Sequence, residues 1–211
     1  MNFQEISFEG IKGVLLDFDN TFYEYAPCHD AGLRASFEEF KKIKDILYED
    51  FLTRYTDAQK KVKSRTKGQG ASHSRFLYFQ KLLEQLEGKT NVAKTMELEE
   101  IYWSTFILHM KLKNDVVDFL TRCRENGVKT CLVTDLTAHV QFRKMKAIGV
   151  DTLLDFVVTS EEAGAEKPDE SPFSLALEKL QLSPSEVIMI GDDNIKDIDG
   201  AHTQGVKAYM V

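Results

Sequence analysis

Short apolar runs that stop abruptly at polar residues constrain this sequence most. They cover residues 13–16 and a stretch that begins at residue 187 and ends at two acids, and a further strand is predicted over residues 128–134. An uninterrupted apolar run of this length is typical of a strand buried on both faces, as in parallel sheets between helix layers. From residue 113 these runs alternate with segments of helical periodicity. The sequence therefore predicts an α/β fold, a doubly wound parallel sheet with helices on both faces.

The predicted elements follow one another in a regular order after residue 113. We expect helices over 115–125, 138–148, from Ser171 to 180 and over 195–203, and strands over 128–134, 156–159, 187–191 and 206–211. Ser171 and Pro172 form the predicted start of their helix, as N-cap and first-turn proline. Residues 22–110 differ in character, because they are rich in charged and aromatic residues with helical spacing and contain no convincing strand. We predict a core formed by residues 1–21 and 111–211, interrupted by a helical insert over residues 22–110.

Polar side chains stand where the predicted strands end. Asp17, Thr134 and Asp192 each stand at the end of such a strand, and Lys167 lies in the loop after another strand. In doubly wound sheets ligands bind beyond the carboxyl ends of the strands. Asp17 and Asp19 are two residues apart, so both carboxylates should point the same way. Such a pair either keeps a proton, which suits a general acid, or binds a cation.

Composition and charge limit the kinds of molecule that this protein is expected to bind. The net charge of -7 argues against nucleic acids and anionic membranes, and a small-molecule substrate is favoured. No apolar run approaches the roughly 18 residues of a membrane span, and the N-terminal residues lack signal-peptide features. The three cysteines are far apart in the sequence and lie in no C-x-x-C arrangement. We expect a cytoplasmic protein, and the sequence carries no signal of its oligomeric state.

Four motifs in order resemble those of the haloacid dehalogenase superfamily in its phosphatase form. They are Asp17-Phe18-Asp19-Asn20-Thr21, Thr134 in L-V-T-D, Lys167 in E-K-P-D, and the acidic run from Gly191 to Asp197. The insert that follows the first motif resembles the helical cap of the first cap class in this superfamily. The resemblance implies a lid with hinges near residues 22–26 and 111–114, which would admit a small substrate and exclude bulk water.

The resemblance also implies a role for each motif residue. Asp17 would be the nucleophile that forms an aspartyl-phosphate, and Asp19 would be the general acid and base. Mg²⁺ would be bound by a side-chain oxygen of Asp17, the backbone carbonyl of Asp19 and the side chain of Asp192. The substrate phosphate would be bound by Thr134, Asp135 and Lys167. Asp197 and Thr21 would lie one layer further out, behind the residues that contact the metal and the phosphate. Asp193 is expected to face water rather than to orient the metal.

Three functions remain open on these grounds. The first is a Mg²⁺-dependent phosphatase of a small phosphorylated metabolite, with sugar phosphates, acyl sugar phosphates and nucleotides as candidates. The second is a phosphomutase of the beta-phosphoglucomutase type, and the third is a non-catalytic module that binds a phosphorylated ligand. Dehalogenation is disfavoured, because a halide leaves without a proton and needs neither the acid at Asp19 nor a metal.

Overall fold

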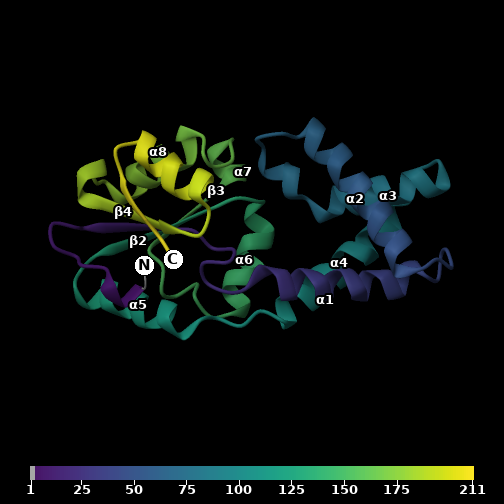
Figure 1. The fold of residues 1–211 in the computed structure, drawn as a ribbon, viewed down its shortest axis with the longest axis horizontal. Coiled ribbons are helices and arrows are strands. Elements are labelled where there is room, and N and C mark those ends of the chain that lie inside the picture. Colours follow the sequence, from purple (N-terminus) through teal and green to yellow (C-terminus); the bar gives the residue numbers. More distant parts are fainter. Residues whose placement is uncertain (1–2) are drawn as a thin grey trace. The chain divides into compact units, whose positions relative to one another are not determined.

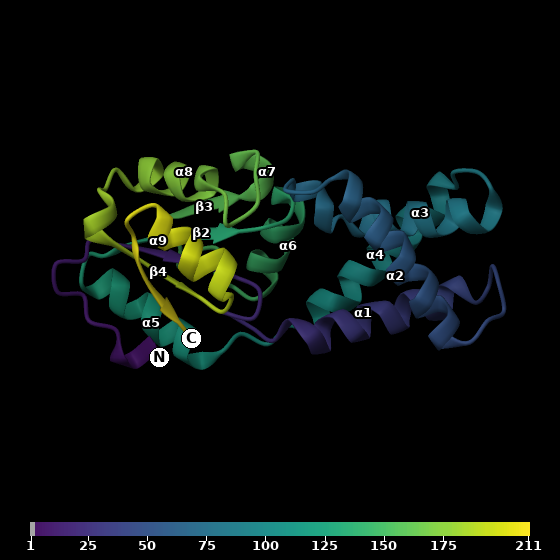
Figure 2. The same ribbon diagram turned by 45° about the horizontal axis from the view of Figure 1, so that its top comes forward.

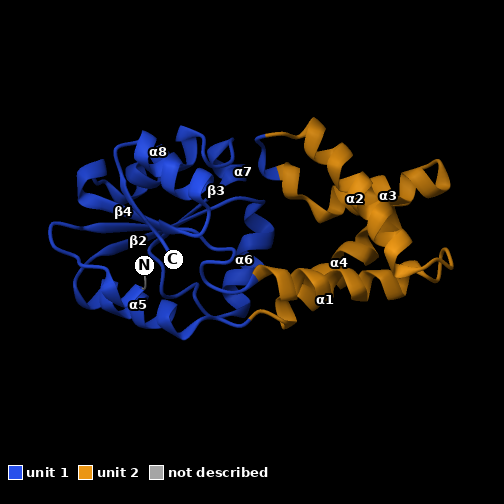
Figure 3. Ribbon diagram, in the orientation of Figure 1, with its two compact units in different colours: residues 1–24, 68–70, 111–211 blue, residues 25–67, 71–110 orange. Residues whose placement is uncertain are grey.

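The computed structural model describes residues 3–211. The chain divides into two compact units (Figure 3): unit 1 comprises residues 1–24, 68–70 and 111–211, and unit 2 comprises residues 25–67 and 71–110. Within residues 3–211, unit 1 holds five strands and unit 2 holds four α-helices. Each unit has its own buried core.

Unit 1 is built from strands that alternate with helices. Its elements are η1 (Phe3–Glu5), β1 (Gly13–Leu16), α5 (Asn114–Glu125), β2 (Lys129–Thr134), α6 (Ala138–Ala147), β3 (Phe156–Thr159), α7 (Ser160–Ala163), α8 (Glu170–Leu180), η3 (Pro184–Glu186), β4 (Val187–Gly191), η4 (Asn194–Asp199), α9 (Gly200–Thr203) and β5 (Lys207–Met210). The strands form one parallel sheet in the order β3-β2-β1-β4-β5. β1 is therefore the central strand, and its Leu16 pairs with Leu132 of β2 and Ile190 of β4.

Helices cover both faces of the sheet, with α8 and α5 on opposite sides in Figures 1 and 2. Side chains alternate along each strand, so Leu15, Val133 and Met189 pack with Phe173 of α8 in one cluster. On the other side, α5 buries Phe119, whose ring lies 5.0 Å from that of Phe3. Apolar side chains on both faces explain why β1 and β4 are continuous apolar runs.

Unit 2 consists of α1 (Tyr25–Phe40), α2 (Tyr48–Arg65), α3 (Arg75–Glu87) and α4 (Val92–Leu108), with η2 (Gly70–His73) before α3. Its core is aromatic: the rings of Tyr102 and Trp103 lie 4.9 Å apart, edge to face. The guanidinium of the buried Arg75 lies 5.3 Å from each of these two rings. Such aromatic packing accounts for the helical periodicity that the sequence shows in this segment.

The predicted fold class is confirmed, and one local prediction is wrong. The N-cap of α8 is Asp169, whose carboxylate accepts from the backbone N–H of Ser171, so the helix begins before Ser171. A helix is present where one was predicted over 195–203, as a π-helical segment, η4, followed directly by α9. Among residues 3–211, no helix combines the length and the apolar character that a membrane crossing requires.

Candidate active site

Three neighbouring strands bring the predicted polar residues to one edge of the sheet. Asp17 directly follows β1, Thr134 is the last residue of β2, and Asp192 directly follows β4. The backbone N–H of Asp17 still donates to the carbonyl of Ile190, at 2.9 Å, so the pairing with β4 continues up to the aspartate. Because the strands are parallel and adjacent, their carboxyl ends place these side chains on the same side of unit 1.

A cluster of three carboxylates lies at this edge. One oxygen from each of Asp17, Asp192 and Asp197 lies within 4.8 Å of the others. Asp197 can come this close because Gly191 has no side chain: a Cβ at residue 191 would stand 2.3 Å from Asp197 Oδ2. The backbone N–H of Asp193 donates to the same oxygen, at 3.0 Å. Asp197, predicted to lie one layer further out, thus stands within the carboxylate cluster.

Lys167 neutralises part of this cluster. Its ammonium lies 2.7 Å from Asp17 Oδ1 and 2.6 Å from Asp197 Oδ1, and all three side chains are buried. Burial alone would lower the pKa of Lys167. The two carboxylates raise this pKa by more than burial lowers it, so the lysine is charged. Burial raises the pKa of Asp17 to about 7, although Lys167 opposes this change. Together with Asp192, three carboxyl groups are gathered around this one ammonium.

The other oxygen of Asp17 is also held. Thr21 donates its hydroxyl to Asp17 Oδ2 at 2.9 Å, so both carboxylate oxygens have a donor. Asp193 does not merely face water: its Oδ1 accepts from the backbone N–H groups of Ile195 and Lys196 and so caps η4. That cap fixes the start of the segment that carries Asp197.

The side chain of Asp19 has partners that the sequence did not point to. Lys144 of α6 forms an ion pair with Asp19 Oδ1, and the hydroxyl of Tyr23 donates to the same oxygen. The Lys144 side chain is fully buried, and its ammonium lies 5.0 Å from the ring of Phe18 and 5.3 Å from that of Tyr23. Sequence analysis missed Lys144 because a lysine on a predicted amphipathic helix is ordinarily assigned to the exposed face.

Thr134 and Asp135 are engaged by further side chains. The Gln141 amide nitrogen lies 2.6 Å from Thr134 Oγ1 and 2.7 Å from the carbonyl oxygen of Asp135. The Asp135 carboxylate accepts from the backbone N–H of Lys167 at 3.1 Å and pairs with Lys196 at 2.6 Å. This carboxylate is thus committed to holding the loops in place, so any contact of residue 135 with a phosphate would come from its main chain.

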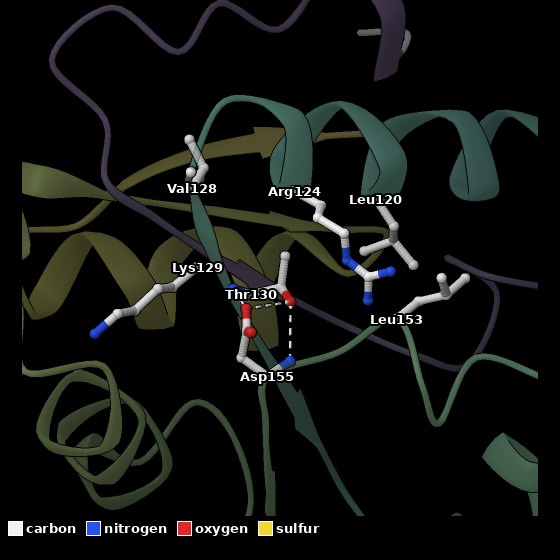
Figure 4. Close-up of a pocket in the computed structure, with 8 residues that line it drawn as sticks. Leu120, Arg124, Val128, Lys129, Thr130, Leu153 and Asp155 are labelled. Carbon is white, nitrogen blue, oxygen red and sulfur yellow. Dashed lines mark hydrogen bonds between the residues drawn. The ribbon is translucent and has the colours of Figure 1, made fainter.

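Unit 1 also has a hollow, shown in Figure 4, that lies away from this site. It is lined by residues at the start of β2, where Asp155 accepts from the backbone N–H of Thr130 at 2.7 Å and from its hydroxyl at 3.1 Å. Thr130 stands at the opposite end of β2 from Thr134. The hollow therefore contributes nothing to the candidate active site.

Comparison with known proteins gives the class to which this fold and site belong. Residues 11–205 match the family described as haloacid dehalogenase-like hydrolase. A ribulose-1,5-bisphosphate 5-phosphatase of Halopiger xanaduensis is 37% identical over 198 residues, 93% of this chain and 83% of the relative. The chain belongs to the haloacid dehalogenase-like hydrolases.

A second relative supports the activity and a solved structure shows the same fold. A glyceraldehyde 3-phosphate phosphatase of Methanopyrus kandleri is 30% identical over 203 residues, 95% of this chain and 84% of the relative. The magnesium-bound crystal structure of the HAD-hydrolase YfnB from Bacillus subtilis has the same fold, with a TM-score of 0.70, 21% identity, and coverage of 94% of this chain and 87% of that one. The predicted family is confirmed, and within it this chain is a phosphatase.

Proposed function

We propose that this protein is a Mg²⁺-dependent phosphatase that hydrolyses a small sugar phosphate through an aspartyl-phosphate intermediate. The observation that carries the proposal is the position of Asp17 at the end of the central strand, with Lys167 and Thr21 on its two oxygens. These contacts orient a carboxylate for attack on phosphorus. Asp19, two residues on, supplies the second acid that such a reaction needs.

In the proposed mechanism, Asp17 and Asp19 carry out the hydrolysis in two steps. In the first, an Asp17 oxygen forms a bond to phosphorus, the bond from phosphorus to the substrate oxygen breaks, and Asp19 gives its proton to that leaving oxygen. In the second, Asp19 takes a proton from a water molecule, which attacks the aspartyl-phosphate and releases inorganic phosphate and free Asp17. Lys167 and Thr134 stabilise the negative charge on the phosphoryl oxygens during both steps.

A divalent cation fits the carboxylate cluster. Asp17, Asp192 and Asp197 offer three oxygens within 4.8 Å of one another, and oxygen ligands of this kind suit Mg²⁺. Asp17 and Asp192 are the proposed side-chain ligands, with the backbone carbonyl of Asp19. Because Lys167 holds Asp197, this carboxylate serves to link the lysine to the cluster. When bound, Mg²⁺ supplies the positive charge that lets a phosphate dianion approach several carboxylates.

The named activities of the relatives support a substrate class for this chain. The two matched phosphatases act, by their names, on ribulose 1,5-bisphosphate and glyceraldehyde 3-phosphate, and both compounds are small phosphorylated sugars. The chain aligns with more than four fifths of each relative, so the resemblance includes unit 2 as well as unit 1. We propose that a sugar phosphate of similar size is the substrate here.

The test is a screen of phosphorylated sugars, with nucleotides and acyl sugar phosphates beside them, in the presence of Mg²⁺ and of EDTA. We expect release of inorganic phosphate from a sugar phosphate, dependent on Mg²⁺ and abolished by Asp17→Asn in a folded protein. Formation of a sugar phosphate isomer without phosphate release would favour the phosphomutase. Binding of phosphorylated ligands without turnover of any of them would favour a non-catalytic module.

A further inference from the structure

Gln141 occupies an unusual place beside the candidate phosphate site. It lies on α6 and is fully buried. Its amide nitrogen contacts two oxygens, Thr134 Oγ1 at 2.6 Å and the carbonyl oxygen of Asp135 at 2.7 Å. Its amide oxygen is also buried, and within residues 3–211 it has no hydrogen-bond partner. The amide is therefore used for its nitrogen alone.

The chemistry of the neighbours fixes the orientation of this amide. A carbonyl oxygen can only accept hydrogen bonds, so the Gln141 atom beside the Asp135 carbonyl must be the N–H₂ group. The same N–H₂ group then donates its second hydrogen to Thr134 Oγ1. The reverse orientation would set two acceptor oxygens 2.7 Å apart, which is repulsive.

This arrangement leaves the hydroxyl proton of Thr134 to be donated elsewhere. Because Oγ1 receives a hydrogen bond from Gln141, its own proton must point away from that nitrogen. Within residues 3–211 its one acceptor is the Asp135 carbonyl, at 3.3 Å, which is long for an O–H···O bond and already accepts from Gln141. The hydroxyl is thus a donor that is held weakly and is easily redirected.

We propose that Gln141 is a positioning residue, which aims the Thr134 hydroxyl proton at an oxygen of the bound phosphoryl group. The inference rests on the proposed phosphatase function, because it takes the phosphate to lie beside Thr134. Gln141 itself does not contact the substrate in this proposal. Its effect is to keep the hydroxyl from turning inward, so that the donor is already oriented when phosphate binds.

The experiment is a double-mutant cycle between Gln141 and Thr134. Gln141→Met has a side chain of similar length without the amide, and Thr134→Val keeps the shape of threonine without the hydroxyl. Affinity for inorganic phosphate in the presence of Mg²⁺ is measured by calorimetry, and kcat/KM is measured on the sugar phosphate found in the screen. We expect Thr134→Val to weaken phosphate binding about tenfold, the effect of one hydrogen bond to a charged group, and Gln141→Met to weaken it about threefold or more.

The decisive result is whether these effects add. If Gln141 acts through the Thr134 hydroxyl, Gln141→Met causes no further loss in the Thr134→Val background. Gln141→Glu should weaken phosphate binding more than Gln141→Met does, because a carboxylate would accept the hydroxyl proton and turn it inward. Equal losses from Gln141→Met in both backgrounds, or none in the wild-type background, would overturn the proposal.

Two controls separate the other outcomes. Thermal unfolding of each variant is measured, and a loss of phosphate affinity that merely follows a loss of stability counts against a positioning role. The phosphate-binding measurement does not depend on turnover. If the wild type binds phosphate but releases none from any ester, the proposed function fails while the cycle still tests the role of Gln141.

Discussion

Replacing Lys167 by methionine tests how the carboxylate cluster is held together. The change keeps an unbranched apolar stem and removes an ammonium that lies 2.7 Å from Asp17 and 2.6 Å from Asp197. At an effective dielectric constant near 20, each contact is worth about 6 kcal/mol before the cost of desolvation. The three side chains are between 1% and 11% exposed, so water cannot replace the lost charge. Removing one partner of a buried pair costs about 3–5 kcal/mol.

The assay is thermal unfolding followed by circular dichroism in EDTA, where no divalent cation supports the site. For a chain of about 200 residues, 1 kcal/mol corresponds to a change of about 2–4 °C in Tm. We therefore expect Lys167→Met to lower the Tm by roughly 6–20 °C. Added Mg²⁺ should restore part of the loss, because it binds the folded cluster and supplies positive charge there.

Two matched variants make the reasoning refutable. Lys196→Met also removes a lysine ion pair, at 2.6 Å from Asp135, but the Lys196 side chain is 34% exposed, so a loss of about 1 kcal/mol or less is expected. Asp197→Asn combined with Lys167→Met should be more stable than Lys167→Met alone, since it removes one of the two buried carboxylates that the lysine neutralises. A Tm for Lys167→Met within about 2 °C of the wild type would refute the account of the cluster.

Three further predictions concern other parts of unit 1. Lys144 orients the Asp19 carboxylate through their ion pair, so Lys144→Met should reduce kcat/KM at least about tenfold on an alkyl phosphate, whose leaving oxygen needs the proton of Asp19. The loss should be smaller on 2,4-dinitrophenyl phosphate in a single turnover, and equal losses on the two substrates would contradict this orienting role. Asp192→Asn should weaken Mg²⁺ binding at least about tenfold, measured as the Mg²⁺ concentration needed to raise the Tm, and an unchanged midpoint would exclude Asp192 as a ligand. Burial raises the pKa of Cys123 and of Cys131 to about 12, so only about one thiol in 10⁴ is ionised at pH 8. Iodoacetamide should modify both cysteines in urea and neither in the native protein, and the labelling rate of the native protein should rise as pH increases. Rapid labelling of the native protein at pH 8 would show that the sites open.

The strand ends could be predicted from the sequence because each is a local signal. A buried strand needs an apolar run, and the first polar residue after it marks the edge of the sheet, so Asp17, Thr134 and Asp192 are found one at a time without knowing the fold. The parallel topology then places them together. The N-cap of α8 was misplaced for a related reason: Asp169 and Ser171 are both good caps, and sequence alone does not decide between two residues so close together.

The partners on α6 could not be predicted in this way, because their signal depends on which face of the helix is buried. Gln141 and Lys144 are three residues apart and so share one face of the helix. In a periodicity analysis, polar residues of this kind are assigned to solvent, yet both are fully buried beside the apolar Val140 and Met145. The sequence does offer one clue, which is a polar residue on the apolar stripe of a helix that follows a motif strand. This clue identifies a particular contact only when the fold shows which partner lies opposite the residue.

That placement makes α6 part of the site and not only a cover for the sheet. Burying a lysine and a glutamine costs free energy, whereas burying apolar residues at the same positions would not. Each of the two polar side chains therefore needs a compensating contact. Lys144 forms an ion pair with Asp19, after β1, and Gln141 donates a hydrogen bond to Thr134, at the end of β2. Because β1 and β2 are adjacent, one helix face can serve both strand ends. The acid after β1 and the hydroxyl at the end of β2 are thus oriented by a helix outside the four motifs.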